Sequence, residues 1–432
     1  MQKENQSIFR LAVLVAALGY FVDIYDLLLF TIVRKPSLVD IGVTDVQMIM
    51  ASAKIIDRQM IGLLIGGVVW GIMGDRKGRL SVLFGSIMLY SVANFLTGYV
   101  QTVEQYAWAR FAAGIGLAGE LGAGITLVSE LLPKNKRGIG TSLVAGVGLF
   151  GAVFAYFVYK ATDGWQMPYS FLGFEGVLEG GWRLCYKIGG VLGIMLLLLR
   201  ISVAESGMFS EIKNKKVSQG NILMFFNNRK RFRKYALAIL IGLPTWYVIG
   251  ILVNYSDRFA GALYGQNLID SGRSIMFGYV GIATGDILIG FISQYFQSRK
   301  KALFLFYGLS VLSMIFFFSP WNNNDSSMYL ACLMLGFSTG FWAIFVTMGA
   351  EQFGTNLRAT AATTIPNMVR GALPVINYMF LSLFQGTLQW TILGSAIVTG
   401  VIVMAIAVVA AMFTEETFHK DLNFLEGEEM LP

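Results

Sequence analysis

Charged residues and cysteines are both scarce in this chain of 432 residues. Only 14% of the residues are charged, whereas a soluble protein carries about 25%, so an ordinary cytosolic enzyme is excluded. The two cysteines, Cys185 and Cys332, lie in separate apolar runs, which excludes a secreted disulfide scaffold. The one histidine, His419, lies in the C-terminal tail, so carboxylates must carry out any proton transfer within the apolar runs.

Several chemical motifs are also missing. The sequence has no cluster of metal-ligating residues, no Gly-x-x-x-x-Gly-Lys-Ser/Thr nucleotide loop and no nucleophile–base pair. These absences predict a protein that is not an enzyme and has no metal or other cofactor. We assign the net charge of +7 to basic loops rather than to nucleic-acid binding. A lipid bilayer and a small solute are the expected partners.

Apolar residues make up 55% of the chain, and the mean hydropathy is +0.62. That share is roughly 240 residues, as many as twelve membrane-spanning helices of about 20 residues need. The runs are longer than the alternating segments of a transmembrane β-barrel, which are about ten residues long. The sequence therefore predicts an all-α polytopic membrane protein with twelve transmembrane helices, at residues 9–33, 51–73, 80–99, 105–131, 139–160, 182–204, 234–256, 274–296, 301–319, 327–350, 359–384 and 387–413.

The basic residues are distributed unevenly between the two sides of these spans. If the N-terminus lies in the cytoplasm, 22 of the 33 Lys and Arg residues lie on inside segments, as the positive-inside rule requires. We therefore expect a multi-pass protein of a bacterial inner membrane, with both termini in the cytoplasm.

The longest inside connection divides the chain into two sets of six spans. It covers residues 205–233, between an N-terminal bundle at 1–204 and a C-terminal bundle at 234–413, and an acidic cytoplasmic tail follows at 414–432. We interpret the basic cluster at the end of this connection as an inside anchor and linker, and binding to anionic lipid head groups is the alternative.

The two halves share a charged motif. Glu130 and Arg137 follow the fourth span, and Glu351 and Arg358 follow the tenth, so the offset between the two motifs is 221 residues. Because the fourth span matches the tenth, the repeat is parallel and covers six helices. Two six-helix halves with the substrate bound between them are a transporter architecture.

The loop between the second and third spans carries a recognisable motif, Gly-Asp-Arg-Lys-Gly-Arg at 74–79. This loop resembles the signature loop of the major facilitator superfamily. The stretch 110–120, with the motif at 130–137, is similar to the sugar-porter and the organic-ion or metabolite:proton symporter branches, and Asp23-Ile-Tyr-Asp26 resembles the acidic first-helix motif of related proton symporters. The resemblance implies the major facilitator fold, built as two six-helix pseudo-repeats, and secondary active transport.

The resemblance also assigns charged residues at the cytoplasmic helix ends to a gate that holds one conformer closed. The alternative is a solvated loop that sets orientation, plus two unconnected surface ion pairs worth about 0–1 kcal/mol each. The gate candidates are Gly74, Asp75, Arg76, Gly78, Arg79, Glu130, Arg137, Glu351 and Arg358.

Asp23 and Asp26 lie deep in the first span. At 1.5 Å per residue, Asp26 is about 24 Å from the start of the span, and the two carboxylates share a helix face. A carboxylate at that depth needs a partner, water or a proton, and Arg110 in the fourth span lies at a similar depth. In similar proton symporters such an Asp–Arg pair links proton and substrate movement, so we predict proton coupling at Asp23, Asp26 and Arg110. A static pair that fixes helix packing and direct substrate binding are the alternatives.

Charged residues in other spans are further candidates. Glu120, next to glycines in the fourth span, lines the cavity or belongs to the inner gate. Arg370 lies between Pro366 and Pro374 in the eleventh span, and a buried Arg can hold a carboxylate or phosphate through two parallel hydrogen bonds. Alternatively, Arg370 binds backbone carbonyls freed by the prolines, or Asp286 of the eighth span. Asp286 is also a candidate second proton site.

Aromatic and amide side chains near the middle of the spans suit a polar organic solute. Packing or an interfacial aromatic belt would explain the same residues. The substrate candidates of this kind are Trp246, Tyr247 and Asn254 in the seventh span, Trp342 in the tenth and Asn367 in the eleventh.

These features predict a monomeric secondary active transporter. Its substrate is a small polar or anionic metabolite, such as a sugar or an organic acid, moved together with protons by alternating access. An exporter or a uniporter of a small organic compound is the alternative within transport. A non-transporting membrane sensor on the same fold is an alternative from another class.

Overall fold

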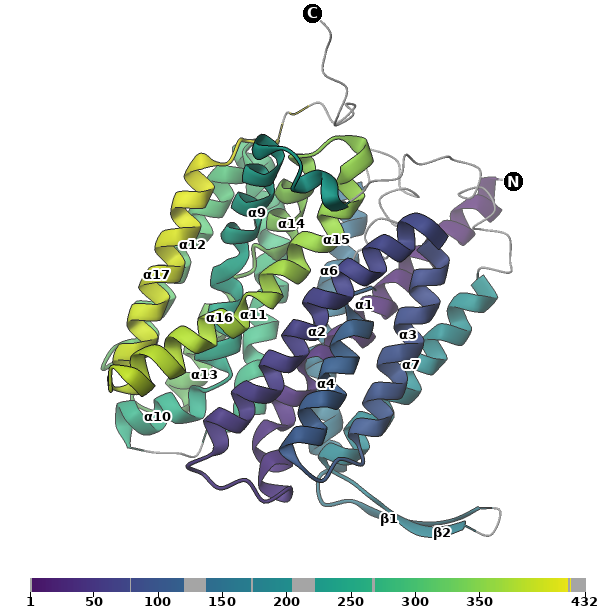
Figure 1. Cartoon of the computed structure of the whole chain (residues 1–432), viewed down its shortest axis with the longest axis vertical. Coiled ribbons are helices and arrows are strands. Elements are labelled where there is room, and N and C mark those ends of the chain that lie inside the picture. The colour runs from purple at the N-terminus through teal and green to yellow at the C-terminus, as the bar shows by residue number, and fades with distance from the viewer. Residues whose placement is uncertain are drawn as a thin grey trace, which may run out of the picture.

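A computed structural model describes residues 2–77, 79–119, 137–171, 174–203, 222–265, 269–418 and 420 of the chain. These residues form helices almost throughout, together with one antiparallel pair of strands (Figure 1). Each of the twelve predicted spans coincides with at least one helix. The predicted all-α membrane architecture is therefore confirmed.

The helices of the N-terminal half match the predicted spans to within a few residues at most boundaries. The first helix is the main exception, because it begins earlier and ends later than predicted and contains Pro36. The last part of the fourth predicted span lies outside the described residues. The helices are α1 (Gln2–Asp40), α2 (Met48–Lys77), α3 (Arg79–Thr97), α4 (Val103–Leu117), α6 (Arg137–Thr162) and α7 (Trp182–Val203).

A β-hairpin connects α6 and α7. Its strands, β1 (Gln166–Phe171) and β2 (Phe174–Glu179), pair antiparallel, with Gln166 opposite Glu179. Sequence reasoning missed the hairpin because segments this short leave no run of membrane-spanning length. In Figure 1 the hairpin projects from the end of the bundle opposite to the start of α1 and the end of α17. We call these two ends the hairpin end and the terminal end.

Several helices of the C-terminal half are interrupted. The seventh span continues from α9 into a π-helical turn, the tenth is broken at residues 339–341, and the eleventh consists of three successive pieces. The elements are η2 (Ile222–Phe225), α9 (Arg229–Tyr247), η3 (Val248–Val253), α10 (Ser256–Tyr264), α11 (Ser271–Phe296), α12 (Arg299–Phe318), α13 (Asp325–Ser338), α14 (Trp342–Glu351), α15 (Thr355–Gly371), α16 (Leu373–Asn377), η4 (Tyr378–Thr387) and α17 (Ile392–Phe413).

Seven helical segments within the described residues are long and apolar enough to cross a bilayer. The other five predicted spans correspond in position to α1, α2, α3, α4 and the α15–η4 series. The seven segments are Val144–Thr162, Trp182–Ile201, Arg229–Val253, Ser271–Phe296, Arg299–Phe318, Asp325–Glu351 and Ile392–Phe413.

The two halves pack against each other mainly along two pairs of helices. α6 lies against α11, and α2 lies against α15. Within the C-terminal half, α11 and α13 approach closely because Gly281 and Gly285 face backbone atoms of α13, where a Cβ atom would overlap Leu333 and Phe337. Small residues of this kind let helix backbones touch in a membrane protein.

Candidate functional site

A buried arginine lies at the contact between the two halves. Arg370 of α15 is 4% exposed, and its neighbour Gly371 packs against Leu64 of α2 in the other half. One turn earlier, Nδ2 of Asn367 donates a hydrogen bond to the main-chain oxygen of Ala118 at 3.1 Å. The packing of α15 on the N-terminal half therefore places Arg370 at their interface.

Two tryptophans from separate helices face the Arg370 guanidinium. Its Cζ lies 5.5 Å from the ring centroid of Trp342 and 6.0 Å from that of Trp246, which is within the range of cation–π attraction. Nη1 donates to Oδ1 of Asn367 at 3.3 Å, whereas Nε has no hydrogen-bond partner among the described residues. The fold thus brings together four of the predicted substrate residues.

Two carboxylates and a phenol complete this group. The hydroxyl of Tyr20 in α1 lies within electrostatic range of Arg370, Asp286 and Asp23. Asp286 of α11 accepts a hydrogen bond from the backbone N–H of Ala343 at 3.0 Å, and Asp23 of α1 is 5% exposed. We call this group the central cluster, and its members are Tyr20, Asp23, Trp246, Asp286, Trp342, Asn367 and Arg370.

Two other predicted substrate residues lie elsewhere. The hydroxyl of Tyr247 donates to the main-chain oxygen of Ala396 in α17 at 2.7 Å, so it holds two helices of the C-terminal half together. Asn254 is fully buried and precedes Tyr255, whose ring lies 5.2 Å from Cζ of Arg34 towards the hairpin end. A substrate contact for Tyr247 or Asn254 stays a prediction.

Arg110 of α4 is fully buried and is held by acceptors from three other helices. Nη2 donates to the main-chain oxygen of Asp26 at 2.7 Å, Nη1 to Oδ1 of Asn94 at 2.5 Å, and Nε to Oε1 of Gln59 at 3.2 Å. Its Cζ also lies 5.3 Å from the ring centroid of Tyr186 in α7. Arg110 therefore links α1, α2, α3 and α7 at one point.

Arg110 contacts Asp26, but not through the side-chain ion pair that the sequence predicted. Arg110 binds the main-chain carbonyl of Asp26, and neither carboxylate oxygen of Asp26 has a hydrogen-bond partner among the described residues. Neutral oxygens of Asn94 and Gln59 accept hydrogen bonds from Nη1 and Nε of the same guanidinium. Gly189 of α7 lies directly against this carboxylate, since a Cβ built there would overlap Oδ1 of Asp26.

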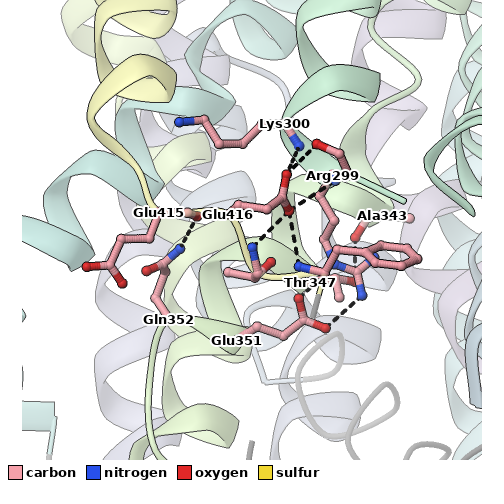
Figure 2. Close-up of polar contacts among 11 residues, drawn as sticks. Arg299, Lys300, Ala343, Thr347, Glu351, Gln352, Glu415 and Glu416 are labelled. Atoms are coloured by element: carbon pink, nitrogen blue, oxygen red, sulfur yellow. Dashed lines mark hydrogen bonds and ion pairs between the residues drawn. The ribbon is translucent and has the colours of Figure 1, made fainter. Parts of the chain in front are cut away.

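Glu351, at the end of α14, forms an ion pair at the terminal end. Arg299 donates to its carboxylate from Nε at 2.7 Å and from Nη2 at 2.8 Å (Figure 2). This planar, two-point contact is the strongest form of an Arg–carboxylate pair. Arg358 instead donates to the main-chain oxygen of Phe353 at 3.3 Å. A local Glu351–Arg358 surface pair, the alternative interpretation of the repeat, is therefore not what the structure contains.

The segment after α17 contributes a second carboxylate at this end. Glu416 accepts hydrogen bonds from the hydroxyl of Ser298 and from the backbone N–H groups of Arg299 and Lys300, both at 3.1 Å (Figure 2). Burial alone would raise the pKa of the Glu416 carboxyl, but these hydrogen bonds, with one from Phe418, outweigh it and hold the pKa below its ordinary value. Glu416 thereby caps the start of α12, a role that sequence reasoning missed.

Four polar contacts between described residues join the two halves at the hairpin end. The most deeply buried is the ion pair of Arg34 in α1 with Asp257 in α10. Sequence reasoning missed it, because single charges near span ends usually reach head groups and these two residues are 223 positions apart. The other contacts are Lys160 to Asp270 at 2.9 Å, Arg258 to Asp45 at 3.3 Å and Asn377 to Asp57 at 2.6 Å.

The remaining predicted gate residues are placed in part or not at all. Glu120, Glu130 and Gly78 lie outside the described residues. No group of three or more His, Cys, Asp or Glu residues that could hold a metal ion is found within the described part of the chain. The structure describes the backbone alone at five other gate candidates. These are Gly74, Asp75 and Arg76 in α2, Arg79 at the start of α3 and Arg137 at the start of α6.

The chain matches the family model described as Major Facilitator Superfamily over residues 11–376. It belongs to this superfamily. It is 26% identical to the niacin transporter NiaP of Acinetobacter baylyi, over 95% of this chain and 94% of that protein. It is 24% identical to the cis,cis-muconate transport protein of the same species, over 94% of this chain and 95% of that protein.

A solved structure shares the fold. The major facilitator superfamily proton:xylose symporter XylE superposes with a TM-score of 0.71 at 17% sequence identity, covering 97% of this chain and 98% of XylE. This similarity confirms the predicted twelve-helix fold. As a member of the superfamily, the protein is a multi-pass membrane transporter of metabolites and not an enzyme.

Proposed function

We propose that this transporter imports a small anionic metabolite, a carboxylate, together with protons by alternating access. The observation that carries the proposal is Arg370, a buried cation at the contact between the halves. Two indole rings lie beside it, and its Nε–H has no hydrogen-bond partner in the part of the chain that the structure describes. A guanidinium binds a carboxylate through parallel hydrogen bonds, and indole faces suit a planar frame. Niacin and cis,cis-muconate, named for two relatives, are both planar carboxylates.

The charges of the central cluster support a link between anion binding and protons. Arg370 is the cation of the cluster, and Asp23 and Asp286 are its two carboxylates. With both carboxylates ionised the cluster is net negative, which disfavours an anion strongly where the dielectric constant is low. Protonation of Asp23 neutralises the cluster, so proton uptake at this residue favours binding of an anionic substrate.

Asp26 is the second proposed proton-binding residue. It is fully buried, and its carboxylate has no hydrogen-bond partner among the described residues. An unpaired carboxylate at this depth is costly when ionised, while Arg110 lies close enough to pair with it after a small rearrangement. Deprotonation would then strengthen the contact of Asp26 with Arg110. Asp23 lies one helical turn away, in the central cluster, and connects this event to the substrate site.

The contacts between the halves support a conformer that is closed at the hairpin end. With the predicted orientation, this end faces outward and the terminal end faces the cytoplasm. The Arg299–Glu351 pair is then part of the inner gate. We propose that Asp75, Arg76, Arg79, Glu130, Arg137 and Arg358 take part in the same gate.

Proton flux in proteoliposomes tests this function. Niacin and cis,cis-muconate are offered as carboxylates, and nicotinamide serves as the uncharged counterpart of niacin. We expect a carboxylate, and not nicotinamide, to acidify the lumen of vesicles that contain the wild-type protein. Asp26→Asn should lose concentrative uptake but keep the exchange of internal for external substrate, because exchange needs no net proton movement.

The outcomes separate the two parts of the proposal. The matched control is Asp163→Asn, which changes an exposed aspartate near the hairpin end and should behave as the wild type. Equal uptake of nicotinamide and niacin would show that the substrate need not be an anion. Uptake without proton movement, unchanged in Asp26→Asn, would leave the Asp26–Arg110 contact as a packing feature only.

A further inference from the structure

The tenth span is broken at residues 339–341, and backbone carbonyl groups at the end of its first part accept side-chain hydrogen bonds. α13 ends at Ser338, and α14 begins at Trp342. The hydroxyl of Thr339 donates back to carbonyl groups of the last turn of α13, and Ser310 of α12 donates to the main-chain oxygen of Ser338 at 3.0 Å. Backbone groups within a membrane need such partners, so the break is a built feature of the helix.

The start of α14 takes its cap from another helix. Its own N-cap residue, Phe341, makes no side-chain capping hydrogen bond. Oδ1 of Asp286 in α11 accepts the backbone N–H of Ala343 at 3.0 Å instead. The first N–H groups of a helix have no intrahelical partners, and an acceptor there also meets the positive end of the helix dipole. Asp286 is therefore the cap of α14.

Two glycines bring Asp286 within reach of the break. A Cβ atom built at Gly340 would lie 2.6 Å from Cα of Gly285 and 2.7 Å from the backbone nitrogen of Asp286. No side chain fits between the two backbones at this point. The contact therefore sets the distance that the short aspartate side chain has to span.

Trp342 is the side chain that this cap controls. It is the first residue of α14 and immediately precedes Ala343. Its ring centroid lies 5.5 Å from Cζ of Arg370. Any movement of the start of α14 therefore changes how the indole faces the guanidinium.

We propose that Asp286 is a positioning residue of the substrate site, which holds α14 by its Oδ1 atom so that Trp342 faces Arg370. This is a different role from the second proton site suggested by the sequence, because it needs an oxygen acceptor and not a titrating group. It rests on the proposed function in one respect, namely that Arg370 and Trp342 contact the substrate. Tyr20 is a further titratable group near Asp286.

Two substitutions test separately whether the hydrogen-bond acceptor or the negative charge of Asp286 is needed. Asp286→Asn keeps a side-chain oxygen for Ala343, whereas Asp286→Ala removes it. Hydrogen exchange of the amides at 343–346, followed by mass spectrometry on the purified full chain in detergent, reports on the cap directly. We expect exchange to be about tenfold faster in Asp286→Ala and unchanged in Asp286→Asn, because loss of a cap frays the first turn of a helix.

Uptake kinetics test the consequence for the substrate site. In Asp286→Ala the KM for the transported carboxylate should rise about tenfold, while the number of protons moved per substrate stays the same. Asp286→Asn should not raise the KM, because the oxygen acceptor stays and the central cluster loses a negative charge. The matched control is Asn228→Ala, which removes the N-cap of α9 at the terminal end and should leave the KM unchanged. If Asp286→Ala does not fold, Gly340→Ala displaces the break and should give the same two changes.

Three results would overturn the proposal. The first is equal exchange in the wild type and in Asp286→Ala, which can be measured whether or not any carboxylate proves to be transported. The second is faster exchange with an unchanged KM in Asp286→Ala. The third is loss of proton-coupled uptake with retained substrate exchange in Asp286→Asn, since that result would make Asp286 a proton site.

Discussion

Nη2 of Arg34 lies 2.5 Å from Oδ1 of Asp257, and the two side chains are 0% and 2% exposed. The pair joins α1 to α10 across the two halves, and the Tyr255 ring lies 5.2 Å from Cζ of Arg34. Removing one partner of a buried ion pair costs about 3–5 kcal/mol, because the other charge is left buried and unpaired. A transporter that opens at the hairpin end must separate these residues in every cycle.

Asp257→Ala is therefore expected to favour the conformer that is open at the hairpin end. A cost of about 3 kcal/mol corresponds to a shift of roughly 100-fold in the equilibrium, at about 1.4 kcal/mol per tenfold change. Spin labels at Val46 and Trp321, both exposed residues of opposite halves, report the separation by electron spin resonance. The double variant Arg34→Asp with Asp257→Arg should restore the wild-type distance.

The control for this prediction is Lys160→Ala. Lys160 also forms a cross-half ion pair at the hairpin end, with Asp270, but its side chain is 44% exposed. Exposed pairs contribute only about 0–1 kcal/mol, so this variant should leave the label distance unchanged. An unaltered distance in Asp257→Ala would show that the buried pair does not set the conformational equilibrium.

The membrane fold was predictable because long apolar runs leave few alternatives to transmembrane helices, and because the repeated Glu–Arg motif relates the two halves. The individual partners were not predictable. The alternative interpretation of the repeated motif paired Glu351 with Arg358, whereas α12 supplies Arg299 as the partner of Glu351. Similarly, the types of residue around Arg370 were predicted. The break in the tenth span that turns Trp342 towards Arg370 was not, because no proline marks it in the sequence.

Gly189→Ala is expected to disturb the proposed proton site although no charged residue is replaced. The new Cβ would overlap Oδ1 of Asp26, so α7 or the carboxylate must move. Overpacking of this kind costs about 1–3 kcal/mol. We expect a lower Tm in detergent and a reduced rate of proton-coupled uptake.

Gly308→Ala is the matched control for Gly189→Ala, because a Cβ at Gly308 in α12 meets no atom of another described element within 4 Å. It should keep the wild-type Tm and uptake rate. If Gly189→Ala also behaves as the wild type, then the close approach of α7 to Asp26 has no part in proton coupling.

Glu416→Gln is expected to destabilise the protein in a pH-dependent way. The pKa of Glu416 is held below its ordinary value of 4.5, so its ionised form stabilises the folded state fully at pH values above 4.5. That contribution is lost as the pH falls through the lowered pKa, because both states are then protonated. The difference in unfolding free energy between wild type and variant should be about 0.5–1 kcal/mol at neutral pH, as for other helix caps, and should vanish in acid.

Thermal unfolding in detergent across pH 3–8 measures this difference. Glu415→Gln is the control, because its carboxylate contacts Lys420 at 3.4 Å and is largely exposed. It should show almost no difference from the wild type at any pH. A Glu416→Gln difference that persists in acid would mean that the glutamine disturbs packing, rather than that a charge is lost from the start of α12.

Arg370→Lys is expected to raise the KM for the carboxylate substrate at least tenfold. Lysine keeps the positive charge but loses the planar fork that binds a carboxylate at two points and lies against Trp246 and Trp342. Arg273→Lys is the matched control, since Arg273 also lies against an aromatic ring, 4.8 Å from the Tyr329 centroid, but at the hairpin end. Uptake of labelled substrate over a range of concentrations gives the KM of each variant. An unchanged KM in Arg370→Lys would mean that charge alone is needed at this position, and the proposed planar recognition of the carboxylate would have to be abandoned.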